Sequence, residues 1–327
     1  MSSAPATASA TVRALIDEAH ARLKRARVAF GHGTTKAWDE AVYLVLHALG
    51  LPPDRLTPYL ARRVSAAECE RARRLVAERI RRRVPAAYLT HEAWLGPYRF
   101  YVDERVIVPR SYLADLLREG LTPWVARPER IARSLDLGTG SGCLAILLAK
   151  MFPAARVDAV DVSPAALAVA RRNVAAYRLQ RRIRLARSDL FSALGGRRYD
   201  LIVANPPYVR AAVMRKLPAE YRHEPRLALA GGADGFDAVR AILRAAARHL
   251  SAGGLLVVEV GDNRRRLERA FPRLPFVWPH TASGADRVFM LACRDLTRSA
   301  GAALAPRRAS RAGAGSRRRG VHSTARV

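Results

Sequence analysis

From Ser134 onward, short apolar runs alternate with helical patterns, and this alternation constrains the fold more than any other feature of the sequence. Runs typical of strands occupy 134–138, 156–162, 182–188, 199–204, 254–260, 275–279 and 287–293. Helical patterns occupy 142–151, 164–177, 237–251 and 264–271. Strands that alternate with helices form a parallel sheet that is covered on both faces, so the fold class is α/β. Only the Gly-containing segment 280–286 separates the last two runs, which predicts seven strands with an antiparallel final hairpin.

The chain before this region has a different pattern. Residues 11–90 show helical spacing, and Ser65-Ala-Ala-Glu68 has the form of a capping box, so we predict a small helical domain. In residues 91–110, aromatic residues and valines surround turn signals at Gly96-Pro97 and Asp103-Glu104. That pattern predicts a β-hairpin that links two domains.

The second domain is expected to span 111–296 and to begin with a short helix near 111–119. The two ends, 1–10 and 297–327, consist largely of small residues and lack periodicity; the second also contains many arginines. We expect both ends to be disordered.

The charge of the chain is unusual. Lys plus Arg is 57 and Asp plus Glu is 28, so the formal net charge is +29. Only Lys24, Lys36, Lys150 and Lys216 are lysines. The excess of arginine has two interpretations: a polyanionic partner, with ribosomal RNA a candidate for the basic surface and tail, or a biased coding composition.

Cysteine content and hydropathy exclude several classes of protein. Cys69, Cys143 and Cys293 are far apart in the sequence, which indicates neither a disulfide framework nor a metal site. No apolar stretch approaches the roughly 18 residues of a membrane span, and the N-terminus lacks a signal-peptide pattern. We therefore expect a cytoplasmic protein with no membrane association and no bound metal.

A glycine-rich segment follows the first strand of the α/β region. Asp136 precedes Gly138-Thr139-Gly140-Ser141-Gly142, which leads directly into a helix. Glycines allow close approach of the backbone to a ligand, and the helix N-terminus favours an electron-rich group. The dinucleotide fingerprint needs a glycine at 143, where this chain has Cys, and Asp136 suits a ligand with a positive amino group. A tight strand-to-helix turn without a ligand remains the alternative.

Two further acids stand at the ends of the next two strands. Asp161, about 20 residues past the glycines, can accept hydrogen bonds from ribose hydroxyls. Its alternative role, capping the next helix, is better filled by Ser163, which precedes Pro164. Asp189, with Leu190 beside it, could accept from an adenine amine. A ligand with ribose and adenine but no phosphate requirement is S-adenosylmethionine, which we predict as the cofactor.

Asn205-Pro206-Pro207-Tyr208 ends another apolar strand and indicates the reaction. Prolines donate no backbone hydrogen bond, so nearby carbonyls remain available as acceptors. The Asn205 oxygen and the Pro206 carbonyl could take both hydrogens of a planar NH2 group stacked on Tyr208. Holding that nitrogen beside the sulfonium methyl supplies proximity and orientation, so Asn205 is expected to border the cofactor too. A proline-stiffened turn with no catalytic role is the structural alternative.

These motifs together resemble the protein-(glutamine-N5) methyltransferases of the HemK/PrmB kind. The resemblance covers about residues 11–293, with Asp-Leu-Gly-Thr-Gly-Ser-Gly at 136–142, Asn-Pro-Pro-Tyr at 205–208 and a similar segment at 223–235. It implies the Rossmann-like sheet of class I S-adenosylmethionine-dependent methyltransferases, an N-terminal helical domain that recognises substrate, and a protein glutamine as methyl acceptor.

The family has two bacterial branches, and the linker distinguishes them. Release-factor enzymes usually carry a linker like Pro-Arg-Pro-Glu-Thr-Glu, whereas here Pro109-Arg110 is followed by Ser-Tyr-Leu-Ala-Asp. Residues 100–111 and the segments 31–34 and 38–41 look more like the branch that acts on large-subunit ribosomal protein three. The resemblance therefore favours a glutamine in that protein, with release factors as the alternative.

Four residues have open roles at this stage. His32 and Trp38 could pack in the core or contact substrate, and Arg110 could contact substrate or form a structural ion pair. Glu259, which ends a strand near the site, is expected to cap the next helix rather than take part in catalysis.

Two rival functions remain. Similar motifs occur in enzymes that methylate exocyclic amines of nucleic acids, and the basic charge favours this rival somewhat. DNA enzymes of that kind must flip the base and usually carry a separate recognition region. The other rival is a non-catalytic ribosome-assembly binder, against which the complete set of motifs argues.

Overall fold

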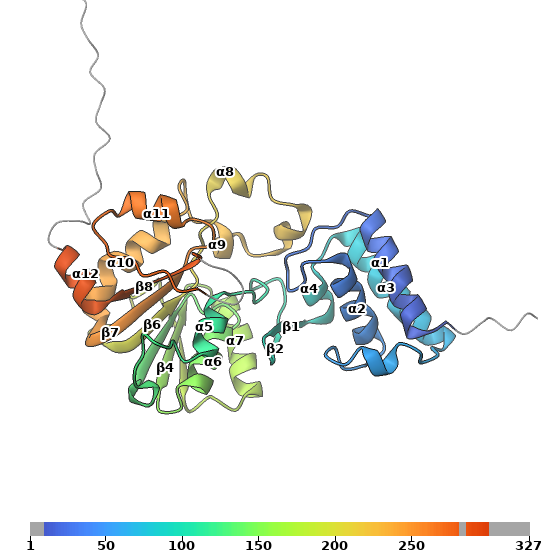
Figure 1. Ribbon diagram of the computed structural model, residues 1–327, viewed down its shortest axis with the longest axis horizontal. Coiled ribbons are helices and arrows are strands. Elements are labelled where there is room, and N and C mark those ends of the chain that lie inside the picture. Colours follow the sequence, from blue (N-terminus) through green and yellow to red (C-terminus); the bar gives the residue numbers. More distant parts are fainter. Residues whose placement is uncertain (1–9, 281–285, 301–327) are drawn as a thin grey trace, which may run out of the picture.

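The computed structural model describes residues 10–280 and 286–300, arranged as a helical unit and an α/β unit joined by a β-hairpin (Figure 1). Nearly all of the expected disordered lead, 1–10, and the tail from 301 onward lie outside the described residues. Within the described part, helix α12 (Cys293–Ala300) extends past Thr297, where the sequence predicted the irregular tail to begin.

The helical unit consists of α1 (Val12–Arg25), α2 (Ala37–Ala48) and α3 (Ala66–Arg82), followed by the short α4 (Ala86–Thr90). A 3-10 turn, η1 (Thr57–Tyr59), lies between α2 and α3. The predicted capping box is present: the Ser65 side chain accepts from the Glu68 amide, and the Glu68 side chain accepts from the Ser65 amide. Apolar faces of the three long helices form one buried cluster.

The linker forms the predicted hairpin at the first of its two turn signals. Strand β1 (Glu92–Leu95) pairs antiparallel with β2 (Tyr98–Tyr101) around Gly96-Pro97, and Gly96 has a φ of +59° that favours glycine. Asn173 fixes the hairpin to the α/β unit, since its side chain accepts from the Tyr101 amide and donates to the Tyr101 carbonyl.

A six-stranded sheet with the order β5-β4-β3-β6-β7-β8 forms the centre of the α/β unit. The strands are β3 (Arg133–Leu137), β4 (Arg156–Asp161), β5 (Ile183–Arg187), β6 (Tyr199–Ala204), β7 (Leu250–Glu259) and β8 (Val288–Ala292). All neighbours are parallel except β7 and β8, which are antiparallel; the sequence predicted the last strand to be antiparallel but assigned it a different partner, 275–279. Successive strands are added on one side of β3 as far as β5, and β6 then begins the other side, so the strand order reverses between β3 and β6. Ligands of open α/β sheets bind at such a point.

The strand count differs from the prediction. The expected strand 275–279 contributes to the sheet only through an antiparallel bridge between Val277 and Met290. Pro275 and Pro279 flank that bridge and lack the N–H that a longer ladder needs, so pairing stops on both sides.

Helices cover both faces of the sheet. On one face lie α5 (Leu113–Arg118) and α6 (Cys143–Met151), with α7 (Pro164–Ala176) beside them. On the other lie α10 (Asp237–His249), α11 (Arg264–Ala270) and α12. Alternate residues of a strand enter opposite cores: on β6, Leu201 and Val203 face one cluster, and Ile202 and Ala204 face the other.

Four short helical turns complete the described elements. A turn η2 (Pro128–Arg130) precedes β3, and α8 (Ala211–Met214), η3 (Ala219–His223) and α9 (Arg226–Leu229) lie between β6 and α10. No helix among the described residues is long and apolar enough to cross a bilayer. The three cysteines are all free and buried.

Candidate active site

A cavity of about 410 Å³ opens at the carboxyl ends of β3, β4, β5 and β6, beside the reversal of strand order. Six of the predicted site residues that were assigned to the cofactor line it: Gly138, Gly140, Asp161, Asp189, Leu190 and Asn205. Pro207 of the Asn-Pro-Pro-Tyr segment lines it as well. The other predicted cofactor residues do not line it: Thr139, Ser141 and Gly142 belong to the glycine loop itself, and Asp136 precedes that loop.

The glycine loop depends on backbone conformations that other residues rarely adopt. Gly138, Gly140 and Gly142 have φ values of +70°, +53° and +81°. A Cβ on Gly138 or Gly140 would meet open space, whereas one on Gly142 would meet Ala170 at 3.2 Å. The first two glycines thus leave the cavity wall bare, and the third allows α6 to pack against α7.

Asp136 supports this loop from beneath. Its Oδ2 accepts from Thr139 Oγ1 at 2.6 Å and from the Ala145 amide at 3.0 Å, while its Oδ1 has no partner among the described residues. The side chain is fully buried, and burial raises the pKa of Asp136 to about 7, with the charge of Asp161 adding to the shift. An unpaired buried acceptor at this depth suits a cationic donor from a ligand.

The other two strand-end acids differ in how firmly they are held. Asp161 Oδ2 accepts from the Gly140 amide and its Oδ1 from the Ser163 amide, both at 2.9 Å. Ser163 itself caps α7, as predicted, because its hydroxyl accepts from the Ala166 amide. Asp189 is exposed at the rim, and Leu190 beside it has a φ of +46°.

The Asn-Pro-Pro-Tyr segment leaves its acceptors available. Within the described ranges, neither the Asn205 side chain nor the Pro206 carbonyl has a hydrogen-bond partner. Segment 229–235 packs tightly against the backbone here: a Cβ on Gly231 would lie 2.7 Å from the Pro207 carbonyl oxygen. Packing against segment 229–235 therefore holds the backbone of this segment in place, while the Asn205 side chain and the Pro206 carbonyl remain available as hydrogen-bond acceptors.

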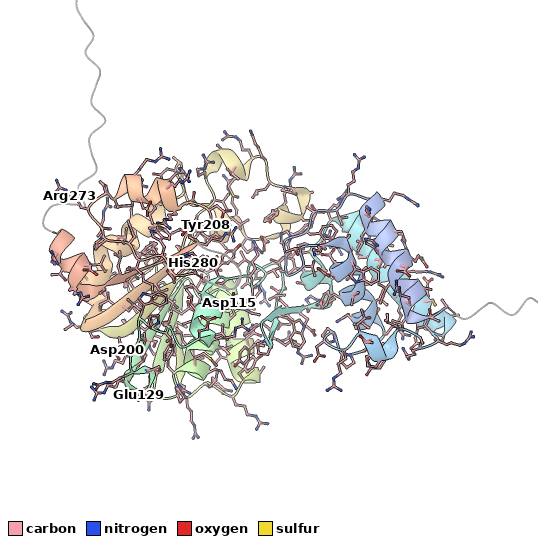
Figure 2. The ribbon with its side chains drawn as sticks, viewed as in Figure 1. Asp115, Glu129, Asp200, Tyr208, Arg273 and His280 are labelled. Atoms are coloured by element: carbon pink, nitrogen blue, oxygen red, sulfur yellow. The ribbon has the colours of Figure 1, made fainter. Side chains whose placement is uncertain are left out.

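Tyr208 is held by contacts the sequence did not predict. Its hydroxyl donates to Glu259 Oε1 at 3.3 Å, and its ring packs on Gly261, where a Cβ would lie 2.8 Å from the ring. Tyr208 lies at the edge of the sheet opposite the one that carries Glu129 and Asp200 (Figure 2).

Glu259 does not cap the following helix, contrary to expectation. Its Oε2 accepts from Ser111 Oγ at 2.5 Å and from the Tyr112 amide at 2.9 Å, at the start of α5. The carboxyl group is fully buried, and burial raises its pKa to about 7, although these hydrogen bonds oppose the shift. Glu259 therefore joins the end of the linker to Tyr208.

Several residues of the cavity wall were missed by sequence reasoning. They come from the linker and from the segment and helix that follow Tyr208: Arg105, Val106, Ile107, Pro225, Leu227, Ala228, Ala230, Asp237, Ala238 and Ala241. The sequence offered one signal for part of this wall, the resemblance of segment 223–235 to the family; in the structure Leu227 of that segment is 61% exposed.

Arg110 and His32 form part of a packed junction between the two units. Glu224 accepts from both ends of the Arg110 guanidinium, at 2.5 and 2.6 Å, and from the Val108 amide at 3.0 Å. His32 is 3% exposed, lies 3.5 Å from Glu224 and packs on Tyr221. Burial alone would raise the pKa of Glu224, but His32 and Arg110 lower it to about 2. Both residues therefore have structural contacts here.

Trp38 also packs against protein, beside His20 and under the Arg13 guanidinium. A second buried network lies deeper in the junction. Arg79, with no exposed surface, donates to Glu40 at 2.7 Å and to the Ala29 carbonyl at 2.7 Å. It also lies 3.3 Å from Glu220, so the helical unit holds the segment that follows the Asn-Pro-Pro-Tyr motif.

A sheet of this order, with a glycine loop after its first strand and Asn-Pro-Pro-Tyr after its fourth, defines a Rossmann-like class I methyltransferase. The pattern of the methyltransferase small domain family matches residues 121–219. No group of three side chains that could hold a metal ion occurs in the described part of the chain.

Sequence comparison is more specific. The chain is 59% identical over 281 residues to the ribosomal protein uL3 glutamine methyltransferase of Bordetella pertussis, covering 86% of this chain and 94% of that protein. Enzymes of the same name from Neisseria meningitidis serogroup B and Bradyrhizobium diazoefficiens are 53% and 48% identical, over 86% and 84% of this chain and 92% and 88% of theirs. The chain belongs to the family of ribosomal protein uL3 glutamine methyltransferases.

Proposed function

We propose that the protein transfers a methyl group from S-adenosylmethionine to the side-chain amide nitrogen of a glutamine in large-subunit ribosomal protein uL3. The observation that carries this proposal is a pair of unused acceptors beside a cavity of about 410 Å³: Asn205, which lines the cavity, and the carbonyl of the adjacent Pro206, which does not. Family membership supports the choice of substrate.

The groups that line the cavity match the ribose and adenine of the proposed cofactor. Gly138 and Gly140 present bare backbone, Asp161 offers carboxylate lone pairs toward ribose hydroxyls, and Asp189 stands at the rim where an adenine amine would lie. Asp136 does not line the cavity but lies beneath the glycine loop, and we assign its unpaired Oδ1 as the acceptor for the positive amino group. When bound, S-adenosylmethionine supplies an electrophilic methyl group.

The chain's residues then orient the glutamine amide. Asn205 Oδ1 and the Pro206 carbonyl each accept one N–H, and the ring of Tyr208 supports the plane of the amide. An amide nitrogen is a poor nucleophile because its lone pair is delocalised, so fixing both N–H bonds directs the remaining density toward the methyl group. The nitrogen loses its proton after transfer, when it has become acidic, so no strong base is needed beforehand.

The proposed division of labour assigns substrate recognition to residues 11–90 and chemistry to 111–296, with 91–110 as linker. Leu227 and the wall formed by 105–107 and 225–230 border the cavity and are placed to contact the protein substrate. Arg79 of the helical unit contacts Glu220, and Arg110 of the linker contacts Glu224, so both parts of the chain hold the segment that leads into this wall.

A labelled-methyl assay tests the proposal. Purified uL3, a release factor with its Gly-Gly-Gln loop, and ribosomal RNA are offered separately, and the modified atom is located by mass spectrometry. We expect label on one glutamine of uL3. Label confined to the release factor would transfer the activity to the other branch, and label confined to RNA would replace glutamine with a base amine as acceptor.

A further inference from the structure

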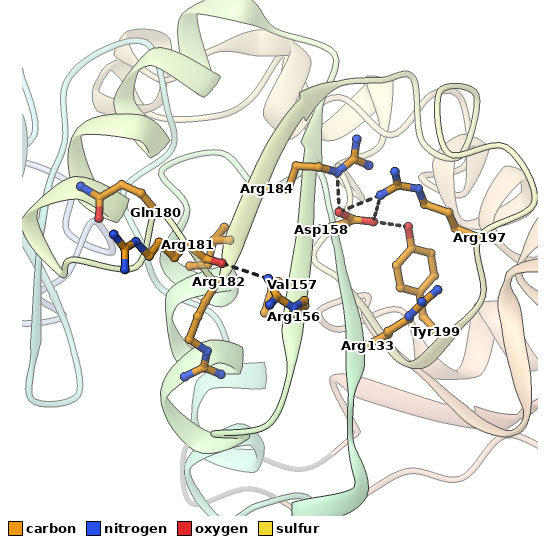
Figure 3. Close-up of a pocket in the computed structure, with 11 residues that line it drawn as sticks. Arg133, Arg156, Val157, Asp158, Gln180, Arg181, Arg182, Arg184, Arg197 and Tyr199 are labelled. Atoms are coloured by element: carbon orange, nitrogen blue, oxygen red, sulfur yellow. Dashed lines mark hydrogen bonds and ion pairs between the residues drawn. The ribbon is translucent and has the colours of Figure 1, made fainter.

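A second cavity, of about 630 Å³, lies at the amino ends of β3, β4, β5 and β6, and arginines dominate its lining. Six arginines surround it together with a single acid, Asp158; they are Arg133, Arg156, Arg181, Arg182, Arg184 and Arg197 (Figure 3). The arginines come from the starts of three strands and from the loops beside them. The cavity is therefore strongly cationic without any contribution from the C-terminal tail.

Three of the arginines are held in place by the protein. Arg184 and Arg197 donate to Asp158 at 2.7 and 3.0 Å, and the buried Tyr199 hydroxyl donates to the same carboxylate at 2.7 Å. Arg182 donates to the carbonyls of Phe152 and Ala155. These contacts neutralise one charge and fix part of the wall.

Other guanidinium groups are uncommitted. Arg133 and Arg181 are exposed, and neither side chain has a hydrogen-bond or ion-pair partner among the described residues. Arg156 donates only to the Arg181 carbonyl, at 3.3 Å, and so keeps most of its donors. The cavity thus offers at least two full guanidinium forks to a ligand.

The remaining lining excludes an ordinary protein partner. Its apolar members, Val157, Ile183 and Tyr199, are 1%, 4% and 2% exposed. Protein interfaces depend on exposed apolar or aromatic anchors at their centre, and this cavity has none in its lining. Nucleic-acid interfaces are more polar and far more positive, and an arginine fork matches two phosphate oxygens at once.

We propose that this arginine cavity binds the phosphodiester backbone of RNA. Arginines from separate strands and loops are spread along one edge of the sheet, as a chain of phosphates requires and a single phosphate does not. The preference for RNA over DNA rests on the proposed function, because a ribosomal protein is destined for an RNA assembly.

The position of the cavity is compatible with catalysis. It shares no lining residue with the methyl-transfer cavity. Strands of five to six residues, at roughly 3.3 Å per residue, separate the two edges by about 20 Å. RNA held at the amino edge leaves the carboxyl edge open to a protein substrate.

The test removes the two uncommitted charges in the full-length chain. Arg133→Gln/Arg181→Gln is compared with Arg25→Gln/Arg55→Gln, which removes the same charge from exposed arginines of the helical unit whose side chains have no hydrogen-bond or ion-pair partner in the described part of the chain. Binding of fluorescein-labelled oligouridylate and of a labelled RNA duplex is measured by anisotropy over about 50 to 200 mM salt. Each lost phosphate contact lowers the slope of log K against log salt by about 0.7 to 0.9.

We expect the cavity variant to lose about 1.5 units of slope and the control variant to stay close to the unsubstituted chain. Arg133→Lys/Arg181→Lys, which keeps the charge, is expected to retain the slope. Equal losses in the cavity and control variants would show that net charge alone binds RNA and would overturn the proposal.

Competition identifies the ligand class. RNA displaced equally well by poly-glutamate at matched charge would assign the cavity to an acidic protein. Displacement by inorganic phosphate or ATP at matched phosphate would assign it to a small anion, and tighter binding of a DNA duplex would reject RNA. Because none of these measurements uses methyl transfer, they stand or fall separately from the proposed reaction. Circular dichroism and a thermal midpoint like those of the unsubstituted chain confirm that the cavity variant is folded.

Discussion

The hydroxyl of Tyr208 lies 3.3 Å from Oε1 of Glu259, so a buried carboxyl group on β7 holds the last residue of the proposed amide slot, which follows β6. The other oxygen of Glu259 accepts from Ser111 and from the Tyr112 amide. One side chain thereby sets the position of the aromatic ring relative to the end of the linker. Glu259 is not among the residues that line the cavity, so we assign it a positioning role that acts through Tyr208.

Replacing Glu259 separates its structural contribution from catalysis. Glu259→Ala leaves three donors without an acceptor, at about 1–3 kcal/mol for each buried group, and is expected to lower the thermal midpoint markedly. Glu259→Gln keeps one acceptor oxygen and should remain folded, with a reduced kcat and an unchanged KM for the cofactor. Equal kcat in Glu259→Gln and the unsubstituted chain would show that Tyr208 does not depend on this contact.

The buried acids also predict how stability depends on pH. The pKa of Glu259 is raised by burial from its ordinary 4.5 to about 7, so the folded chain keeps a proton that the unfolded chain has lost in this window. The free energy of unfolding should therefore fall as pH rises from about 4.5 to about 7. Asp136, raised to about 7 as well, contributes with the same sign.

Urea titrations of the unsubstituted chain and of Glu259→Gln across that window measure the effect. The variant lacks one of the two titrating groups, so its stability should fall less steeply with pH. Identical slopes would indicate that Glu259 is ionised in the folded chain well below neutrality.

Asn205→Ala is expected to lower kcat by about 10²-fold or more, because the amide loses one of its two acceptors and its orientation with it. Cofactor affinity should persist, since the glycine loop and Asp161 are untouched. Calorimetric titration with S-adenosylmethionine and a single-turnover methylation assay give the two values. Methyl transfer at the original rate would remove Asn205 from the mechanism.

Gly140→Ala tests the bare backbone of the cofactor wall. The new Cβ would project into open space that the cofactor is proposed to occupy, at a φ of +53°. Gly50→Ala is the matched control: Gly50 has a φ of +64°, also faces open space, and lies in the helical unit. Both variants should lose similar stability, on the order of 1 kcal/mol, while only Gly140→Ala weakens binding of S-adenosylmethionine. Equal cofactor affinity in the two variants would place the cofactor elsewhere.

Arg79 should be among the least replaceable residues of the junction. Arg79→Met leaves Glu40 and Glu220 buried beside an apolar side chain, and breaking such a network costs about 3–5 kcal/mol. Arg74→Met, which removes an exposed partner of Glu70, should change stability by less than about 1 kcal/mol. Urea unfolding of the two variants measures the difference, and comparable midpoints would contradict the predicted weight of the buried network.

Local patterns predicted most of the fold because local chemistry determines most of its boundaries. The Ser65–Glu68 capping box, the turn at Gly96 and the Ser163 cap all occur where the sequence placed them. The strand predicted at 275–279 was wrong in extent, because apolar content alone does not show that Pro275 and Pro279 interrupt the ladder. 

The site was predictable where it depends on strand ends and unpredictable where it depends on distant contacts. Asp161, Asp189 and Asn205 follow strands whose carboxyl ends must meet at one edge, so their arrival at one cavity could be inferred. Ser111 and Glu259 are 148 positions apart, and the wall residues 105–107 and 225–230 meet only through tertiary packing. The periodicity of the sequence does not predict contacts between residues so far apart in the chain.

The contact between Arg79 and Glu220, which are 141 positions apart, has a consequence for how such enzymes can diverge. A helical unit recombined from another lineage would bring an arginine or its replacement into a pocket shaped by the host's own Glu220 and by Glu224 four positions later. We therefore expect the two parts to diverge together, with changes of substrate preference arising by paired substitutions across the junction rather than by exchange of a whole module.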